Sequence, residues 1–365
     1  MGKLLLPLVL LFTSLTCFGV TPEQIKELRQ AAEQGDPRAQ YHLGAMYAAG
    51  KGVLVDGKEA VKWFRKSAEQ GHAGAQDLLG SLYASGLLRV PVDNIEAFKW
   101  RRLAAEQGHT KAQYRLGRMY DKGLGVPEDD TEADKWYRKS AEQGYAEAQY
   151  DLGLRLIYDN GKGVLVNTKE AVKWFRKGAE QGHAGAQHML GLSYAEGVGI
   201  PKNNTAAAKW FSKAAEQGVA GAQYELGVAY RNGQGVPEDN TEAVKWYRKA
   251  AEQGFAMAQS NLGFMYDNGN GVTKDKTEAI KWYRLAAEQG YAMAQYNLGL
   301  KYYNGVGVPE DNVLAHMWWD LSAAQGDEKA KKKMGVISKD MSREEIAEAQ
   351  KLSREWMAKH SEKNK

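Results

Sequence analysis

The sequence is dominated by a repeat of about 36 residues. One marker of the repeat is a glycine that closes an A-x-Q-G signature, with successive steps of 36, 37, 36, 38, 36, 36, 36 and 36 residues. These glycines are Gly35, Gly71, Gly108, Gly144, Gly182, Gly218, Gly254, Gly290 and Gly326. A tryptophan recurs with the same spacing and is a second marker. Two markers at one period of this length indicate a solenoid or array.

One unit, residues 219–254, predicts two helices joined by a short connection. In the first half, Ala222, Leu226 and Tyr230 follow the four-residue spacing of a helix stripe, and Gly233 stands where a left-handed residue ends a helix. In the second half, Asp239 precedes a Glu by three residues, which is the capping-box arrangement at a helix start. No segment shows the sustained alternation of a strand.

A single helical hairpin cannot bury its apolar face alone, whereas stacked copies can. We therefore expect the periodic tryptophans of the second helices to be structural core. They are Trp63, Trp100, Trp136, Trp174, Trp210, Trp246, Trp282 and Trp318.

The consensus A-x-x-Q-x-x-L-G-x-x-Y-x-x-G-x-G-V, followed by D-x-x-x-A-x-x-W and A-A-x-Q-G, resembles the Sel1-like repeat family, relatives of the tetratricopeptide repeats. The resemblance covers residues 36–326 as eight repeats. It implies an all-α fold, a right-handed α/α superhelical solenoid with capping helices at both ends. It also implies an adaptor or scaffold for other macromolecules, and the periodicity itself predicts only the architecture.

The two ends of the chain depart from the repeat. Residues 1–19 have a basic start, an apolar core and small residues before Val20, which predicts a signal peptide cleaved near Gly19. The alternatives are a membrane anchor, for which the apolar run is short, and lipidation of Cys17. Residues 20–35 predict an N-terminal capping helix, 327–359 a degenerate repeat and C-terminal capping helix, and 360–365 a disordered tail.

Cleavage would remove Cys17, the only cysteine, so the mature chain would have no thiol chemistry. The net charge of +4 is too small to argue for nucleic acid or an anionic membrane as partner. We expect a secreted or periplasmic, monomeric protein without a membrane span in its mature form.

Some units deviate from the pattern. The second unit is one residue longer after Gly86, and the fourth is expected to be two residues longer within its first helix, before Tyr158. The capping-box Glu is missing after Asn203 and after Asp311.

No motif points to a cofactor, a metal or a catalytic centre. The Gly-x-Gly loops lack the preceding strand and third glycine of a dinucleotide site. No histidine pair sits at i, i+4 next to a Glu, so no zinc site is predicted. His72, His109 and His183 occupy a position that is elsewhere filled by Tyr and Phe, which predicts a packing role.

The exposed side of the first helices is the remaining candidate site. Because an α-helix turns by about 100° per residue, the side opposite the expected core can be identified from the sequence. This side carries more aromatic and large side chains than a solvent-exposed surface requires. By resemblance to tetratricopeptide arrays, first helices line the concave surface, where such residues would anchor a protein or peptide. The partner-binding candidates are Tyr41, Tyr114, Tyr150, His188, Tyr224, Tyr296, Arg118 and Phe264. These tyrosines could equally pack on the neighbouring unit.

The leading functional hypothesis is a non-enzymatic scaffold in the bacterial envelope or secreted from it. Two alternatives remain open. One is an envelope protein that binds or hydrolyses cell-wall fragments or β-lactams, as described for cysteine-rich relatives. The other is a secreted, host-directed effector.

Overall fold

The computed structural model describes residues 21–157 and 167–361, which are helical with no strand among them. The predicted signal peptide, Cys17 and the last four residues of the predicted tail lie outside the described residues. Contacts divide the chain after Gln181 into two compact units. The first contains α2 (Pro22–Glu33), α3 (Pro37–Ala49), α4 (Gly57–Glu69), α5 (Ala73–Ser85), the 3-10 helix η2 (Leu87–Arg89), α6 (Asn94–Glu106), α7 (Thr110–Lys122), α8 (Asp130–Glu142), α9 (Ala146–Ile157) and α10 (Thr168–Glu180).

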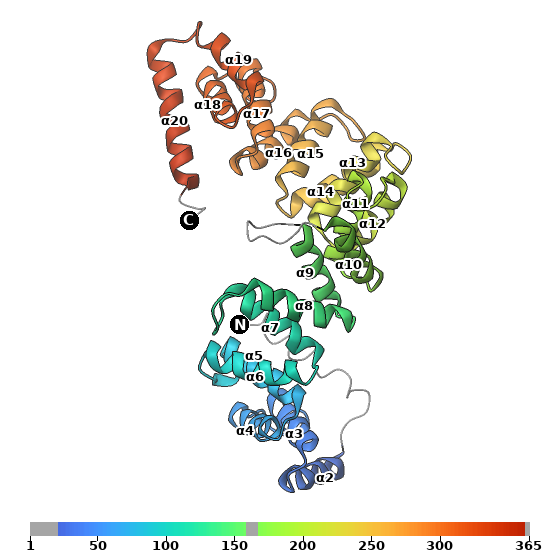
Figure 1. The fold of residues 1–365 in the computed structure, drawn as a ribbon. Helices are drawn as coiled ribbons and strands as arrows, with labels where there is room; N and C mark the ends of the chain where they lie inside the picture. The colour runs from blue at the N-terminus through green and yellow to red at the C-terminus, as the bar shows by residue number, and fades with distance from the viewer. Residues whose placement is uncertain (1–20, 158–166, 362–365) are drawn as a thin grey trace. The chain divides into compact units, whose positions relative to one another are not determined.

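The second unit contains α11 (Ala184–Glu196), α12 (Asn204–Glu216), α13 (Ala220–Asn232), α14 (Asn240–Glu252), α15 (Ala256–Asn268), α16 (Lys276–Glu288), α17 (Ala292–Asn304), α18 (Asn312–Ala323), α19 (Glu328–Ile337) and α20 (Arg343–Ser361). From α3 to α18 the helices form eight consecutive pairs, a first helix packed against a second helix in each (Figure 1). This arrangement confirms the all-α repeat fold.

Each pair is built by the same local signals. In the pair α13/α14, Gly233 takes a φ of 64° and ends the first helix, where a side chain would strain the backbone. Asp239 then caps the second helix, its Oδ1 accepting the N–H groups of Thr241 at 2.8 Å and Glu242 at 3.0 Å. The Asp239 N–H donates to the Tyr230 carbonyl at 2.9 Å, which closes the connection between the helices.

The predicted capping box is only half formed in this pair, because Glu242 turns to Lys245, 3.0 Å away. The cap itself does not need the Glu. Asn203 accepts the N–H of Ala206 at 3.0 Å, and Asp311 accepts that of Leu314 at 2.8 Å, although both units lack it.

The tryptophans of the second helices lie mostly in the interior. Six of the eight are between 6% and 9% exposed, whereas Trp100 and Trp210 are partly exposed. In seven of the eight repeats the residue after the tryptophan is a buried aromatic residue, and Tyr247, for example, is fully buried against Gly227. A Cβ on Gly227 would lie 2.7 Å from a ring carbon of Tyr247, so the close approach requires glycine.

Glutamines connect each repeat to its neighbours. Gln259 in α15 is buried, and its Nε2 donates to the Ala251 carbonyl of the preceding second helix at 3.1 Å. Its Oε1 accepts from Gln289 Nε2, at the end of the following second helix, at 2.7 Å. The same two bonds recur at Gln40, Gln76, Gln113, Gln149, Gln223 and Gln295. The signature glutamines therefore join successive second helices through the first helix between them.

The two longer repeats keep the consensus register up to the tyrosine position of their first helices. The N–H of Asn167 donates to the Leu156 carbonyl at 2.9 Å, as the N–H of Asp239 does to Tyr230. Leu156 therefore holds the tyrosine position, and α9 stays in register to that point. The prediction that the extra residues precede Tyr158 in the tyrosine position is wrong, because Leu156 holds that position and the extra residues follow it. Residues 158–166 lie outside the described residues. In the second repeat, the extra residue lies in the segment that contains η2, where Leu88 and Arg89 have positive φ angles.

The histidines predicted to pack have a more specific role. Nδ1 of His72, His109 and His183 accepts the N–H three residues on, at 3.1, 3.3 and 3.0 Å, so each ring caps a first helix. Burial lowers the pKa of His72 and of His109, which favours the neutral ring that this acceptor role needs. The packing prediction was therefore incomplete.

Helices outside the eight pairs pack on the array at both ends of the described chain. Thr21 and Gln24 form a complete capping box at the start of α2, and α2 packs on α3. At the other end, α19 and α20 both pack against α18. Within the described residues, no helix combines the length and the apolar character needed to cross a membrane.

Candidate interaction surface

The first-helix face is the side of α3, α5, α7, α9, α11, α13, α15 and α17 that carries the predicted partner-binding positions. Phe264 is 41% exposed, and Arg118 is also exposed. The remaining candidates are half-buried, namely Tyr41, Tyr114, Tyr150, His188, Tyr224 and Tyr296.

The tyrosines are half-buried because each contacts neighbouring side chains of the array. The centre of the Tyr224 ring lies 5.9 Å from that of Tyr247 in its own helix pair. It lies 5.4 Å from the ring centre of Phe255, the N-cap of the next first helix. In the first compact unit, Tyr114 lies 5.7 Å from Tyr137 and 5.2 Å from Tyr145. These rings therefore connect adjacent repeats, while part of each ring surface remains exposed to solvent. Each ring can pack within the array and also contact a partner.

A hollow lies on the first-helix face of the second compact unit, and its volume is about 320 Å³. Helices α13, α15 and α17 supply its walls. It is lined by Tyr224, Val228, Arg231, Ser260, Asn261, Phe264, Tyr291, Met293 and Asn297. Two predicted residues, Tyr224 and Phe264, thus come together with neighbours that sequence reasoning did not select.

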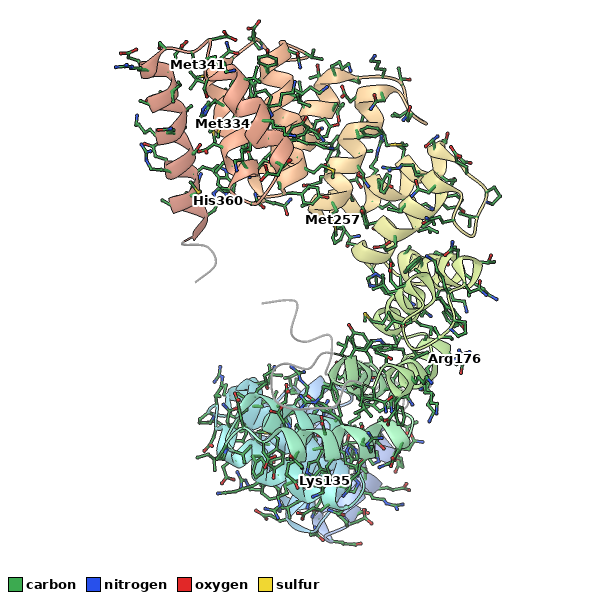
Figure 2. All side chains as sticks on the ribbon, turned by 45° about the horizontal axis from the view of Figure 1, so that its top comes forward. Lys135, Arg176, Met257, Met334, Met341 and His360 are labelled. Atoms are coloured by element: carbon green, nitrogen blue, oxygen red, sulfur yellow. The ribbon has the colours of Figure 1, made fainter. Side chains whose placement is uncertain are left out.

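The lining combines exposed apolar surface with hydrogen-bonding groups. Phe264 and Met293 are 41% and 56% exposed, and the Arg231 guanidinium carbon lies 5.9 Å from the centre of the Phe264 ring. Met257, labelled in Figure 2, adds exposed apolar surface on α15. Asn261 and Asn297 offer amide donors and acceptors. Aromatic, methionine and arginine side chains are enriched at protein interfaces, and amides can pair with a peptide backbone.

Burial favours the protonated, neutral forms of Tyr224, Tyr291 and Glu225. Burial raises the pKa of Tyr224 and of Tyr291, so both phenols remain hydrogen-bond donors at neutral pH. Burial, and then the nearby carboxylate of Glu196, raises the pKa of Glu225 beside the hollow.

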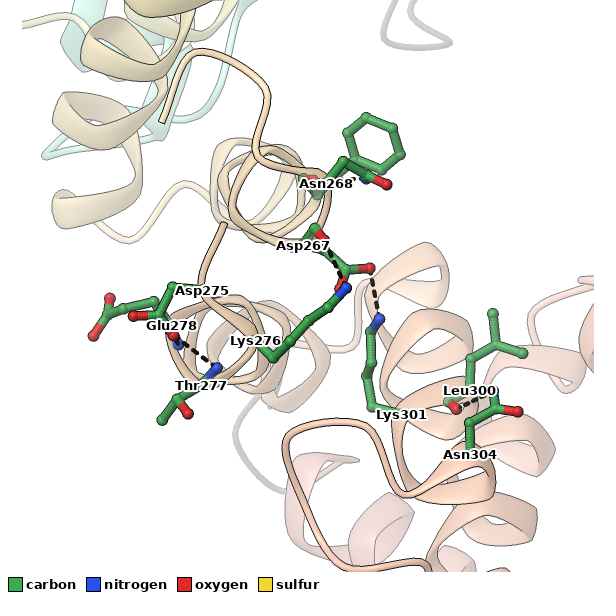
Figure 3. Close-up of polar contacts among 10 residues, drawn as sticks. Asp267, Asn268, Asp275, Lys276, Thr277, Glu278, Leu300, Lys301 and Asn304 are labelled. Atoms are coloured by element: carbon green, nitrogen blue, oxygen red, sulfur yellow. Dashed lines mark hydrogen bonds and ion pairs between the residues drawn. The ribbon is translucent and has the colours of Figure 1, made fainter. Parts of the chain in front are cut away.

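Two charged clusters on the first helices are structural. Asp267 accepts hydrogen bonds from Lys276 and Lys301, which come from α16 and α17 (Figure 3). Burial would raise the pKa of Asp267, but these two hydrogen bonds lower it overall. Lys301 is only 13% exposed, so the carboxylate neutralises a cation inside the repeat interface.

The first compact unit has an equivalent cluster around Arg155, which is 15% exposed. The guanidinium contacts the carboxylates of Asp121, Asp130 and Asp134. Among the residues that the structure describes, no group of three or more histidine, cysteine or acidic side chains is arranged to hold a metal ion.

Sequence reasoning missed the glutamine bonds and the hollow. The signal for the first was present, since both glutamines recur in every unit. The hollow depends on which side chains differ among α13, α15 and α17, and a consensus pattern averages these differences away.

Comparison with known proteins places these features in a family. The Sel1 repeat model matches residues 37–72, 73–109, 110–145, 146–183, 184–219, 220–255, 256–291 and 292–327. No match was found among the curated proteins.

Two solved structures resemble the chain over most of its length. One is a protective antigen with an SLR fold present in uropathogenic Escherichia coli strains. It is 37% identical with a TM-score of 0.84, over 92% of this chain and 72% of that one. The other is a Sel1 repeat protein from Oxalobacter formigenes. It is 35% identical with a TM-score of 0.62, over 87% of this chain and 92% of that one. Sel1-repeat proteins are generally scaffolds for protein interactions. The chain belongs to the Sel1 repeat family.

Proposed function

We propose that this protein is a non-enzymatic scaffold that binds a protein or peptide partner on its first-helix face, the concave face of a superhelical array. The observation that carries the proposal is the hollow between α13, α15 and α17. Its exposed Phe264 and Met293 would bury apolar area on binding, and its amides would pair with the partner's backbone.

The half-buried tyrosines extend this surface to other repeats. Tyr41, Tyr114, Tyr150 and Tyr296 hold the same position as Tyr224, and we propose that their accessible edges contribute contacts there. Aromatic side chains supply large contact area at a small cost in side-chain entropy. His188 and Arg118 belong to the same surface.

We also propose that the mature protein acts outside the cytoplasm, in the periplasm or after secretion. The support is the signal-peptide pattern of residues 1–19 and the similarity to a protein described as a protective antigen. Cleavage near Gly19 would be visible as a mature chain that begins at Val20, measured by mass spectrometry of the protein from the envelope fraction.

Site-specific photo-crosslinking tests the binding surface. A benzoylphenylalanine is placed at Phe264 in the hollow, and in a matched protein at Leu285, which is 39% exposed on the second helix α16. The proposal predicts one discrete protein adduct from position 264 and none from position 285. Equal crosslinking at both positions, or adducts from position 285 alone, would place the partner on another surface.

A further inference from the structure

An arginine replaces a core ring in one repeat of the first compact unit. The residue after the periodic tryptophan is aromatic in the seven other repeats, at Phe64, Tyr137, Phe175, Phe211, Tyr247, Tyr283 and Trp319. In α6 it is Arg101, whose Cγ would lie 2.7 Å from a Cβ built on Gly80. Arg101 therefore occupies the slot against the helix glycine that the rings fill elsewhere.

The neighbouring first-helix position is replaced as well. Where Tyr41 packs 5.9 Å from Phe64, the second repeat has Asp77, which is 5% exposed. An aromatic pair has thus become an arginine and a carboxylate. The two side chains influence each other electrostatically, yet no ion pair within 4.0 Å joins them among the described contacts.

Asp77 is already engaged by another cation. Its Oδ2 accepts a hydrogen bond from Arg115 of α7, and the His109 ring lies 3.9 Å away. Its Oδ1 is buried without a hydrogen-bond partner in the described part of the molecule. The Asp77 carboxylate is therefore buried and paired with Arg115, not with Arg101.

Arg101 lacks a strong partner of its own. Its Nη1 donates only to the Met119 sulfur, at 3.4 Å, and its Nε is buried and unpaired among the described groups. The pKa of Arg101 is lowered to about 10, mainly by burial and then by the charges of Arg115 and Arg118, while Asp77 acts in the opposite direction. A guanidinium in such a place is expensive unless an anion pairs with it.

Arg118 is an exposed residue of the first-helix face and forms no ion pair among the described residues. It follows Arg115 by three residues on α7, so the two side chains are neighbours on that helix. The positive charges of Arg115 and Arg118 both act on Arg101, and Asp77 is the carboxylate that opposes them. A guanidinium fork matches a carboxylate with two parallel hydrogen bonds.

We propose that Arg101, Arg115 and Arg118 form a binding site for a carboxylate side chain of an acidic peptide segment in the partner. The site lies in the first compact unit and does not depend on the hollow between α13, α15 and α17. Its specificity comes from charge, whereas that of the hollow comes from apolar and amide groups.

Fluorescence anisotropy with a labelled hexaglutamate peptide tests the proposal, with hexaglutamine as the uncharged reference. The key variant carries Asp77→Tyr and Arg101→Phe together, which restores the aromatic pair of the first repeat. We expect it to melt at or above the wild-type temperature and to bind hexaglutamate about tenfold more weakly or worse. Arg118→Gln, on the surface, is expected to weaken binding severalfold, and Arg231→Gln in the hollow to leave it unchanged.

Several outcomes would overturn the proposal. Two of them are equal affinity of the wild-type protein for hexaglutamine and hexaglutamate, and a folded double variant that keeps its affinity. Displacement of the peptide by millimolar inorganic phosphate would instead assign the site to phosphate groups. If the double variant melts early, Arg118→Gln decides, because unchanged affinity in that folded variant contradicts the site.

Discussion

The glutamine bonds make a quantitative prediction about how the repeats hold together. Gln259 is 4% exposed and joins two second helices, at 3.1 Å to the Ala251 carbonyl and at 2.7 Å from Gln289 Nε2. Replacing it with leucine keeps the volume and removes both bonds. Each bond contributes about 1 kcal/mol net, so their loss should cost about 2 kcal/mol.

The cost stays near this value because both partners keep another bond. The Ala251 carbonyl still accepts the N–H of Gly254 at 3.0 Å, and Gln289 Nε2 still donates to the Leu285 carbonyl at 3.2 Å. Neither group is left fully orphaned, which would add a further penalty.

Thermal melting followed by circular dichroism measures this effect. For a unit of this size, about 2 kcal/mol corresponds to a drop of about 4–8 °C in the transition that reports the second compact unit. Gln350→Leu, on an exposed position of α20, is the matched control and should melt like the wild type. If Gln259→Leu melts within about 1 °C of that control, the glutamine bonds do not stabilise the repeat interface.

Three further predictions concern packing, pH and buried charge. Gly263→Ala should destabilise by about 1–3 kcal/mol in urea unfolding, since the new Cβ would lie 2.9 Å from a ring carbon of the next helix, whereas Gly335→Ala, in open space, should be neutral or stabilising. Because burial lowers the pKa of His72, the unfolded chain takes up the proton first as the pH falls through about 6.5, so stability is complete above that pH and declines on acidification towards the folded-state pKa. His72→Asn, which caps without titrating, should reduce this loss in melts between pH 7.5 and 5, and an unchanged slope would contradict the assignment. Asp267→Asn should cost about 3–5 kcal/mol in urea unfolding by leaving Lys301 buried and unpaired, and adding Lys301→Met should recover much of that loss; a double variant as unstable as the single one would show that the pairing is not the cause.

Much of the fold could be predicted from the sequence because it depends on local signals repeated eight times. Helix stops such as Gly233 and caps such as Asp239 act within a few residues, so their spacing sets the helix boundaries. The register of the fourth repeat was mispredicted because Leu156 replaces the expected tyrosine. The nearest tyrosine, Tyr158, lies two residues after the consensus position, so matching it to the consensus shifts the predicted register by two residues.

The candidate site was less accessible to sequence reasoning. Helical spacing predicts Tyr224 and Phe264 on one face, and both line the hollow. Their exposure, however, depends on which side chains of the next repeat they contact. Tyr224 is half-buried because its ring packs against Phe255 of the next repeat, while Phe264 remains exposed. Likewise, Arg101 differs visibly from the other repeats, but its unpaired Nε becomes apparent only when the neighbouring helices are in place.

The first-helix face of this protein is proposed to bind another protein, and protection of that face on binding is the decisive property. Hydrogen–deuterium exchange, measured with and without the partner identified by crosslinking, tests it most directly. We expect slower exchange in the segments of α13, α15 and α17 that line the hollow, with α14 and α16 little changed. Protection confined to the second helices or to the connections, with unchanged exchange around the hollow, would contradict the proposal.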